Sequence, residues 1–420
     1  MSVKFYDCSC GAPVSDAAPA CPRCGRPNPQ RRTAMWHGLP TDGATLAAVV
    51  FALGSVAIGA VAVAYPKTIP HSSSPGDGAY LAEHCPDLSD VNECQIRVGL
   101  AQKTASEAGA VHGAITNVRA GAPERVLKVR QTGSFAVSNG TVFAMDVDPN
   151  DEAERADLVR AVVDGAPRKL VTMQRETSAL MTSGDNLVWL TGSDPDQGVL
   201  AGAWRLPLTG GRPTKLGSPS TNLDAPAAID GAAAYFVSRR PGSDVEELVR
   251  APLAGGAPSE LAALSHPFGT RAIAVDDRFV YWNEFGDIWK VPKAGGGAEH
   301  LATASDIFAI ATDGTDVFFT DRGKSVSGVG SVGHMPANGG PIEWVASEQR
   351  LPWGLAVDEA NVYWVSNADR VGGVYARPKS GGAAFAIAIL QNAPVYVAVD
   401  VTYVYWSVAG DGEIRRAAKR

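Results

Sequence analysis

The sequence predicts an all-β chain whose main body is a seven-bladed β-propeller of four-stranded blades, preceded by a small zinc ribbon and one transmembrane helix. Three observations predict the propeller. An apolar strand ending in an aromatic residue recurs at nearly constant spacing, a glycine turn follows each recurrence, and the strand missing from the last repeat stands ahead of the first. The 45 Gly and 28 Pro among 420 residues also suit many tight turns better than long helices.

The repeat is clearest in residues 272–302, the shortest and most regular unit. Its pattern predicts four short strands at 272–275, 279–283, 287–291 and 298–302, separated by turns rich in Asp and Gly. This unit therefore serves as the template against which the others are aligned.

The aromatic position recurs through the array. It is occupied by Ala144 in the first unit and then by Trp189, Phe236, Trp282, Phe319, Trp364 and Trp406. The successive separations are 45, 47, 46, 37, 45 and 42 residues. A turn before the last strand of the first six units contains Gly165, Gly210-Gly211, Gly255-Gly256, Gly295-Gly296, Gly339-Gly340 or Gly381-Gly382. Four-stranded repeats of about 40 to 50 residues are typical of propeller blades.

The seventh unit ends after its third strand, at GEIRRAAKR. The missing glycine turn and fourth strand stand at the other end of the array, in residues 120–130. We therefore expect this N-terminal strand to complete the last blade and close the ring, which removes an exposed sheet edge. The predicted propeller covers residues 121–420.

Two close pairs of cysteines mark residues 1–30 as a zinc-binding head. The candidate ligands are Cys8, Cys10, Cys21 and Cys24. Four thiolates suit a tetrahedral structural Zn²⁺, and a glycine after each pair permits the tight turn around the ion. The spacing resembles that of the short zinc ribbons that head many bacterial membrane proteins, although Ser9 alone separates the first pair. A redox pair and a metal-free ribbon are the alternatives.

After a linker at 31–43, residues 44–65 run for 22 residues without a charge and predict a transmembrane helix. A buried soluble helix is the alternative. Five basic residues precede the run and one follows closely: Lys4, Arg23, Arg26, Arg31 and Arg32, then Lys67. This asymmetry predicts a cytoplasmic N-terminus in the bacterial inner membrane and a periplasmic or extracellular propeller. The length before the run favours an uncleaved anchor over a signal peptide.

Residues 66–120 read as a spacer followed by a short helical elbow that carries Cys85 and Cys94. In an oxidising compartment these two cysteines are expected to form a disulfide with each other. A bond between two chains is the alternative, and it would make an anchored dimer.

The second-strand motif reads Y-W-N at 281–283, Y-W-V at 363–365 and Y-W-S at 405–407, while F-T-D at 319–321 keeps a Thr-Asp pair. Glycine turns of the form K-x-G-G follow two of them. From about 123 to 420 the array resembles the YWTD-type propeller repeats of lipoprotein receptors and, more closely, bacterial exported propellers with V-Y-W and K-x-G-G signatures. The resemblance implies a propeller fold and leaves the function open.

Loops that join strands two and three, or one blade to the next, share one face of a propeller. In this chain these loops vary in length and chemistry, whereas the loops of the opposite face are short and uniform, and we call the two the variable and the uniform face. Variation on one face predicts the binding surface, since loops carry function on a packed scaffold. Its candidate residues are His266, Arg271, Arg350, Trp353, Arg239 and Arg240.

Few residue patterns in the sequence point to catalysis or to a further metal site. Asp146, Asp148 and Asn150 alternate like the ligands of a Ca²⁺ loop, but Asp151 replaces the glycine of the sharp turn, so an acidic hairpin is the favoured interpretation. No G-x-S-x-G sequence nominates a nucleophile.

The sequence favours a membrane-anchored binding or scaffold protein. Its exported propeller would recognise a protein, peptide or glycan, and its zinc ribbon a cytoplasmic partner. The net charge of -7 and the lack of a basic run argue against nucleic acid. The alternatives are a hydrolase or lyase with its site at the central channel, and a structural spacer of an envelope assembly.

Overall fold

The computed structural model describes residues 5–7, 13–15, 123–130, 133–147, 155–163, 165–174, 177–192, 201–219, 226–240, 243–266, 269–323, 328–367 and 372–419. The chain divides into two compact units, Met1–Ser73 and Ser74–Arg420. The second unit holds the propeller.

Seven four-stranded antiparallel sheets form the blades, as the repeats predict. Their strands, in blade order, are β4 (Phe135–Ser138), β5 (Thr141–Val147), β6 (Arg155–Ala161) and β7 (Arg168–Gln174); β8 (Thr177–Ser183), β9 (Asn186–Thr191), β10 (Gly202–Pro207) and β11 (Thr214–Gly217); β12 (Ala227–Ile229), β13 (Ala233–Arg239), β14 (Glu246–Pro252) and β15 (Ser259–Ala263); β16 (Ile273–Val275), β17 (Phe279–Glu284), β18 (Asp287–Pro292) and β19 (Glu299–Thr303); β20 (Ile307–Thr312), β21 (Asp316–Asp321), β22 (Val329–Pro336) and β23 (Glu343–Arg350); β24 (Pro352–Val357), β25 (Asn361–Ser366), β26 (Gly372–Pro378) and β27 (Phe385–Gln391); and β28 (Pro394–Val399), β29 (Tyr403–Val408), β30 (Glu413–Ala418) and β3 (Glu124–Lys128).

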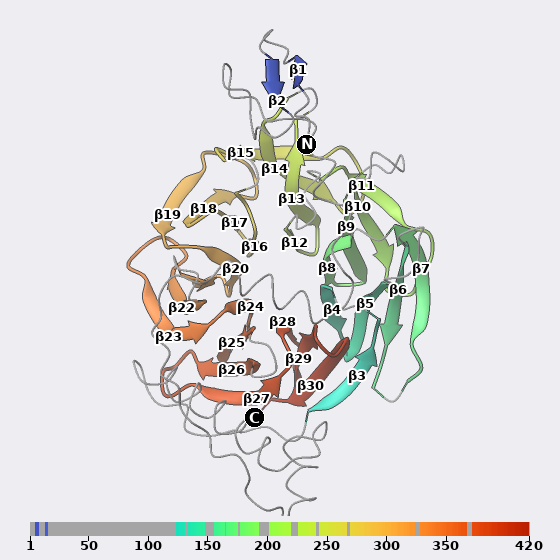
Figure 1. The fold of residues 1–420 in the computed structure, drawn as a ribbon, viewed down its shortest axis with the longest axis vertical. Helices are drawn as coiled ribbons and strands as arrows, with labels where there is room; N and C mark the ends of the chain where they lie inside the picture. Colours follow the sequence, from blue (N-terminus) through green and yellow to red (C-terminus); the bar gives the residue numbers. More distant parts are fainter. Residues whose placement is uncertain are drawn as a thin grey trace, which may run out of the picture. The chain divides into compact units, whose positions relative to one another are not determined.

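The blades stand around a common centre with their first strands innermost and their fourth strands outermost (Figure 1). The first strands of neighbouring blades contact one another around the whole ring. In the template unit, each observed strand lies within one residue of its predicted bounds.

The ring closes as predicted, because β3 pairs antiparallel with β30 and supplies the fourth strand of the last blade. Ion pairs reinforce this pairing: the Arg416 guanidinium lies 2.9 Å from the Glu124 carboxylate, and Arg125 and Lys128 both lie within 4 Å of Glu413. Side-chain charges therefore support the joint where the two ends of the array meet.

The core consists of seven hydrophobic clusters, each shared by two neighbouring blades. The predicted aromatic positions lie in these clusters, and Trp282, Trp364 and Trp406 are at most 1% exposed. In one cluster Tyr363 of the sixth blade packs with Trp406 of the seventh. The aromatic residues that recur in the repeat therefore pack one blade against the next.

A polar clasp repeats on the uniform face. In four blades an aspartate after the first strand accepts hydrogen bonds from the N–H groups two and three residues ahead and from a tyrosine hydroxyl five residues ahead. The pairs are Asp230 with Tyr235, Asp276 with Tyr281, Asp358 with Tyr363 and Asp400 with Tyr405. The fifth blade keeps only the aspartate, Asp313, with its two N–H donors.

Lysines of the next blade pair with three of these five aspartates. Nζ of Lys293, Lys379 and Lys419 lies 2.6 Å from Oδ2 of Asp230, Asp313 and Asp358, respectively. These lysines stand just after the third strand of their blades, in two cases as the K of the K-x-G-G signature. The aspartate after the first strand, the tyrosine of the V-Y-W motif and the lysine of the K-x-G-G motif thus act together to hold adjacent blades.

In the first unit, β1 (Phe5–Asp7) pairs antiparallel with β2 (Pro13–Ser15). The four predicted zinc ligands, the predicted span at 44–65 and the Cys85–Cys94 pair all lie outside the described residues. Within the described ranges, no helix is long and apolar enough to cross a membrane.

Candidate functional site

A connected network of polar side chains lies on the variable face where the third, fourth and fifth blades meet. Two of the predicted residues, His266 and Arg271, lie on the loop that leads from β15 to β16. Near them stand the β17–β18 turn and the short connection from β19 to β20. We call this surface the blade 4 mouth and define it by His266, Arg271, Phe285, Asp306, Phe308, Arg322 and Trp353.

Asn283 anchors the blade 4 mouth from below. This side chain is fully buried, and its Oδ1 accepts hydrogen bonds from the backbone N–H groups of Arg271 and Ala272 at 3.0 and 2.9 Å. Its Nδ2 donates to the carbonyl oxygens of Phe285 and Ile307 at 2.9 and 3.4 Å. One amide therefore fixes the inter-blade loop, the hairpin turn and the first strand of the next blade.

Glu284, the next residue, is also buried, at 2% exposure. Its Oε2 accepts hydrogen bonds from the N–H groups of Ser265 and His266 and lies 3.2 Å from His266 Nδ1. Its Oε1 accepts the indole N–H of Trp282. This carboxylate is therefore occupied by the protein's own donors, and it holds His266 at the surface.

Asp321 has the same role in the fifth blade. Its carboxylate accepts hydrogen bonds from the N–H groups of Ser305, Asp306 and Gly323 at 2.9 to 3.1 Å. The result is a fixed backbone at Asp306, which lies at the edge of the blade 4 mouth.

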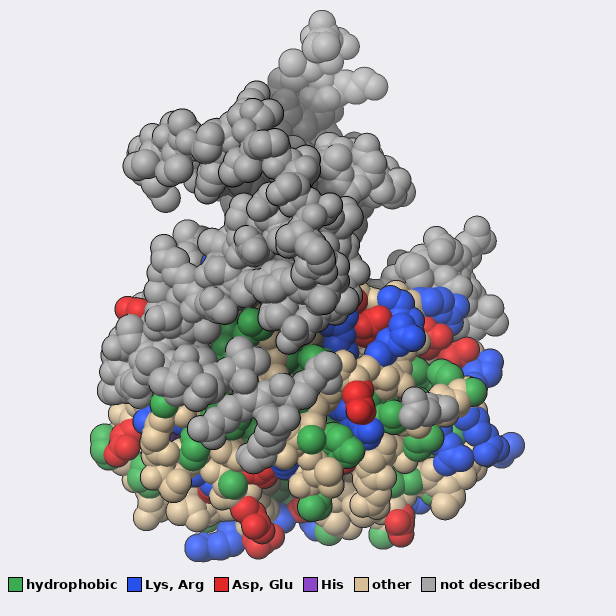
Figure 2. Space-filling view, turned by 90° about the horizontal axis from the view of Figure 1, so that it is seen from below, with side chains coloured by type: hydrophobic (Ala, Val, Ile, Leu, Met, Phe, Trp, Pro, Cys, Tyr) green, Lys and Arg blue, Asp and Glu red, His purple; other side chains and the backbone are tan. Residues whose placement is uncertain are grey.

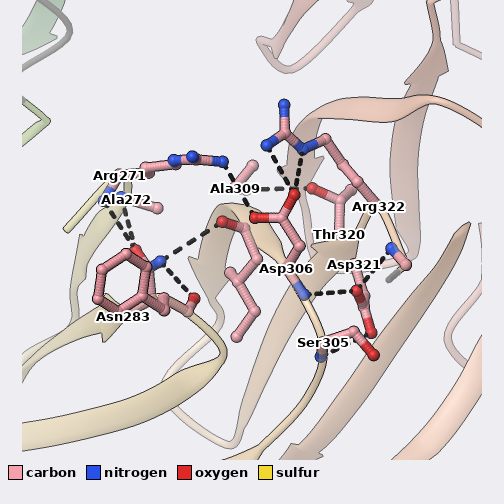
Figure 3. Close-up of polar contacts among 12 residues, drawn as sticks. Arg271, Ala272, Asn283, Ser305, Asp306, Ala309, Thr320, Asp321 and Arg322 are labelled. Carbon is pink, nitrogen blue, oxygen red and sulfur yellow. Dashed lines mark hydrogen bonds and ion pairs between the residues drawn. The ribbon is translucent and has the colours of Figure 1, made fainter. Parts of the chain in front are cut away.

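Two arginines meet on Asp306 (Figure 3). Nη1 of Arg271 donates to Oδ1 at 3.0 Å, and Nε and Nη2 of Arg322 donate to Oδ2 at 3.0 and 2.7 Å. The side chain of Arg271 remains 43% exposed, against 23% for Arg322. Two guanidinium groups therefore share one carboxylate, and the more exposed of them faces solvent.

Aromatic rings continue the site toward the centre of the ring. The guanidinium of Arg322 lies 5.0 Å from the centroid of Phe308, whose ring stacks on Trp353 with centroids 4.8 Å apart. Both residues come from innermost strands, β20 and β24. Thr320 links them, because its hydroxyl accepts from the Ala309 N–H and donates to the Trp353 carbonyl. The indole nitrogen of Trp353 is buried and has no hydrogen-bond partner among the described residues.

Phe285 projects from the two-residue turn between β17 and β18. Its backbone has φ of 54°, in the left-handed region that favours Gly and Asn over a bulky side chain. The ring is nevertheless 53% exposed and makes an edge contact with His266 at 5.6 Å. An exposed aromatic residue in a strained turn indicates a role other than packing.

A second polar group lies at the outer end of the same blade. Oδ1 of Asp287 accepts from the Thr303 hydroxyl at 2.5 Å and lies 3.2 Å from His300 Nε2. The hydrogen bond from Thr303 holds the pKa of Asp287 below its ordinary value against partial burial, and His300 assists. These three side chains join the ends of β18 and β19 through hydrogen bonds.

Of the six predicted face residues, three lie in the blade 4 mouth. His266 contacts Glu284 and Phe285, Arg271 pairs with Asp306, and Trp353 stacks on Phe308. Arg350 is exposed at the end of β23, close in sequence to Trp353. Arg240 turns to the rim of the third blade, where it pairs with Glu247 and Glu260 at 3.2 and 2.8 Å, and Arg239 stands opposite Glu246 in the register of β13 and β14.

Of the Ca²⁺ candidates, Asp146 binds both the backbone N–H and the guanidinium of Arg130. Asp148 and Asn150 lie outside the described residues, so the Ca²⁺ loop stays a prediction. Among the residues that the structure does describe, no group of three His, Cys, Asp or Glu side chains is placed to hold a metal ion.

The surface charge is mixed. In the view of Figure 2, Lys and Arg side chains alternate with Asp and Glu over the visible described surface. The long-range electrostatic field of the described part therefore does not indicate the charge of a ligand. The ligand has to be inferred from the side chains of the site.

Sequence reasoning missed Asn283, Glu284, Phe285, Asp306 and Arg322. A signal was present, since Asn283 and Glu284 occupy the Thr-Asp half of the repeat motif and do the work that Thr320 and Asp321 do one blade later. Phe285 could have been found as a bulky residue in a turn position that favours Asn or Gly.

Comparisons with known proteins identify the fold. No protein-family model and no curated protein sequence matches the chain. Virginiamycin B lyase from Staphylococcus aureus is similar in structure, with 13% identity, a TM-score of 0.53, and coverage of 71% of this chain and 99% of the lyase. An acylaminoacyl peptidase matches at 12% identity and a TM-score of 0.50, over 69% of this chain and 51% of the peptidase. BamB from Moraxella catarrhalis matches at 14% identity and a TM-score of 0.44, over 69% of this chain and 83% of BamB. At these identities the likeness concerns the propeller fold alone.

Proposed function

We propose that this chain is a binding protein whose propeller recognises a partner through the blade 4 mouth. The observation that carries the proposal is the combination of an exposed, strained Phe285 with a solvent-facing Arg271, both fixed by the buried Asn283. A surface held rigid before binding loses little entropy when the partner arrives.

The local chemistry favours binding over the hydrolase or lyase alternative. The buried carboxylates Glu284 and Asp321 are hydrogen-bonded to backbone N–H groups. Asp306 is held by two guanidinium groups, which stay protonated at any physiological pH. A carboxylate that acts as general base needs an acceptor oxygen open to the substrate, and these three carboxylates accept hydrogen bonds from the protein's own donors.

The setting of the propeller is part of the same proposal. Residues 44–65 anchor the chain in the bacterial inner membrane with the zinc ribbon in the cytoplasm, and the propeller meets its protein, peptide or glycan partner on the exported side. Cys85 and Cys94 form a disulfide in the spacer. Metal analysis of the full-length chain should give about one Zn²⁺ per chain, and less than about half would contradict the zinc ribbon.

A photo-crosslinking amino acid placed on each face tests the binding proposal. Position 285 reports on the variable face, and position 401 is its matched control, because Val401 is 96% exposed in a turn of the uniform face. With the full-length chain in its native envelope, we expect one discrete adduct from position 285 and none from position 401. Equal labelling from both positions, or adducts from position 401 alone, would contradict the proposal.

A further inference from the structure

We infer that the ligand of the blade 4 mouth is an acidic peptide segment of a partner protein, with a carboxylate side chain on Arg271 and an apolar side chain against Phe285. The inference rests on the proposed function and adds the chemistry of the ligand.

The exposed guanidinium of Arg271 points to an anion. Its side chain is 43% exposed and shares Asp306 with Arg322, whereas the buried carboxylates Glu284 and Asp321 accept hydrogen bonds from backbone N–H groups. Among the described residues, the Arg271 side chain donates only through Nη1, which leaves Nε–H and the remaining N–H groups of its planar fork for a ligand. A guanidinium with such donors matches the two oxygens of a carboxylate.

The available acceptors point away from a sugar. Hydroxyl groups of a glycan need acceptors as well as donors, and carboxylates commonly supply them. Here the Glu284 and Asp321 carboxylates accept hydrogen bonds from backbone N–H groups, and Asp306 accepts from two arginines. The mouth therefore offers donors and rings but few open acceptors.

The apolar half of the ligand follows from Phe285. Its ring is exposed although its backbone position disfavours a bulky side chain, and it stands on the loop network that fixes Arg271. Asn283 is hydrogen-bonded to the backbones of both Arg271 and Phe285, so these two residues keep a fixed spacing. A ligand that contacts both therefore carries its acidic and its apolar group close together. Neighbouring side chains of a peptide satisfy this requirement.

Fluorescence anisotropy with the full-length chain in detergent micelles tests the inference. The probe is a short labelled peptide that alternates Asp or Glu with Leu or Phe, and its matched control replaces each acid by the corresponding amide. We expect the acidic probe to bind about tenfold more tightly than the amide probe, and added salt to weaken its binding.

Arg271→Gln should weaken binding of the acidic probe about tenfold, whereas Arg278→Gln should leave it within about twofold. Arg278 is the matched control because it lies in the same blade on the uniform face, in the turn between β16 and β17. Arg271→Lys keeps the charge but not the fork, and should fall between the two. Equal affinity for both probes, or equal effects of the Arg271→Gln and Arg278→Gln variants, would overturn the inference.

The two levels of the proposal fail separately. If the amide probe or a neutral oligosaccharide binds and labels position 285, the blade 4 mouth is a binding site and only the acidic ligand is wrong. If probes label position 401 and not 285, both the proposed function and this inference are wrong.

Discussion

The two faces of the propeller use polar side chains for opposite purposes. On the uniform face, the same Asp–Tyr clasp recurs in four blades, and lysines of the following blade complete three of the aspartate sites. On the variable face, Thr320 and Asp321 repeat the role of Asn283 and Glu284 in one further blade, whereas the group of Arg271, Asp306 and Arg322 occurs once among the described blades. Repetition therefore marks groups that fasten blades, and departure from it marks groups free to recognise a ligand.

The electrostatics of the clasps agree with a structural role. Burial opposes ionisation of Asp358, but hydrogen bonds from Lys419, the Asn361 N–H and the Tyr363 hydroxyl outweigh it and lower its pKa below the ordinary value. The pKa values of Asp230 and Asp313 are lowered against burial in the same way. On the tyrosine side, burial and the hydrogen bond to Asp400 raise the pKa of Tyr405 to about 12.

The largest effect on stability is expected from Asn283→Ala. This change leaves two N–H groups and two carbonyl groups without a partner at a buried position, so the free energy of unfolding should fall by about 2–4 kcal/mol. Urea unfolding followed by tryptophan fluorescence measures it. The control is Asn361→Ala, which removes one contact with Tyr363 and should lower the free energy by less than about 1 kcal/mol. Similar losses of unfolding free energy in the two variants would contradict the central role of Asn283 in holding these backbone groups.

A clasp that includes a lysine should contribute more to the free energy of unfolding than a clasp without one. Asp358→Asn removes the charge that holds Lys419, and should lower the free energy of unfolding by about 1–2 kcal/mol. Asp400→Asn is the matched change at a clasp where the structure shows hydrogen bonds from Tyr405 and two N–H groups but no lysine. Its loss should be smaller by about 0.5–1 kcal/mol. A larger loss for Asp400→Asn would contradict the role given to the lysines.

Acid should weaken the aspartate clasps of the uniform face. Since the pKa values of Asp230, Asp313 and Asp358 are lowered in the folded state, their stabilisation is present above the unfolded pKa of about 4 and is lost as the pH falls through their folded values. Unfolding free energies measured from neutral pH down to about pH 3 should decline below about pH 4. The decline should be shallower in Asp358→Asn. An unchanged slope in that variant would contradict the linkage.

The smallest expected effect is a gain in the free energy of unfolding. Phe285→Asn should raise the free energy of unfolding by about 0.5–1 kcal/mol, because Asn tolerates the left-handed backbone that Phe285 adopts. Phe285→Ala, which removes the ring without relieving the backbone, should bring no such gain. Both variants should weaken binding at the blade 4 mouth. A stabilised variant that binds as well as the wild type would show that the strain serves no ligand.

Much of the fold could be predicted because it is periodic. The spacing of Trp282, Trp364 and Trp406 predicted the blades, and the truncated last repeat predicted closure by β3. The predicted site residues stay a prediction. The structure places Arg271 on Asp306, whereas Arg240 turns to Glu247 and Glu260. Periodicity places a residue on a face, but only the partners across a turn or a neighbouring blade decide which way a long side chain points.

The pairing of Arg271 with Arg322 through Asp306 could not be predicted for the same reason. The three residues belong to different loops, spread over some fifty positions, and meet only because β16, β20 and β21 bring their ends together. For Asn283 and Glu284 the repeat motif signals a polar pair, but the sequence alone does not show which backbone groups the two side chains hold.

The central claim, that one face binds and the other fastens, is tested most directly by measuring affinity and stability together in two variants. Arg271→Gln should weaken binding of the acidic peptide probe about tenfold and change the free energy of unfolding by less than about 0.5 kcal/mol. Asp358→Asn should do the reverse, lowering stability by about 1–2 kcal/mol with binding within about twofold of the wild type. If Arg271→Gln costs stability and leaves binding intact, or if Asp358→Asn abolishes binding in a folded propeller, the division between the two faces is wrong.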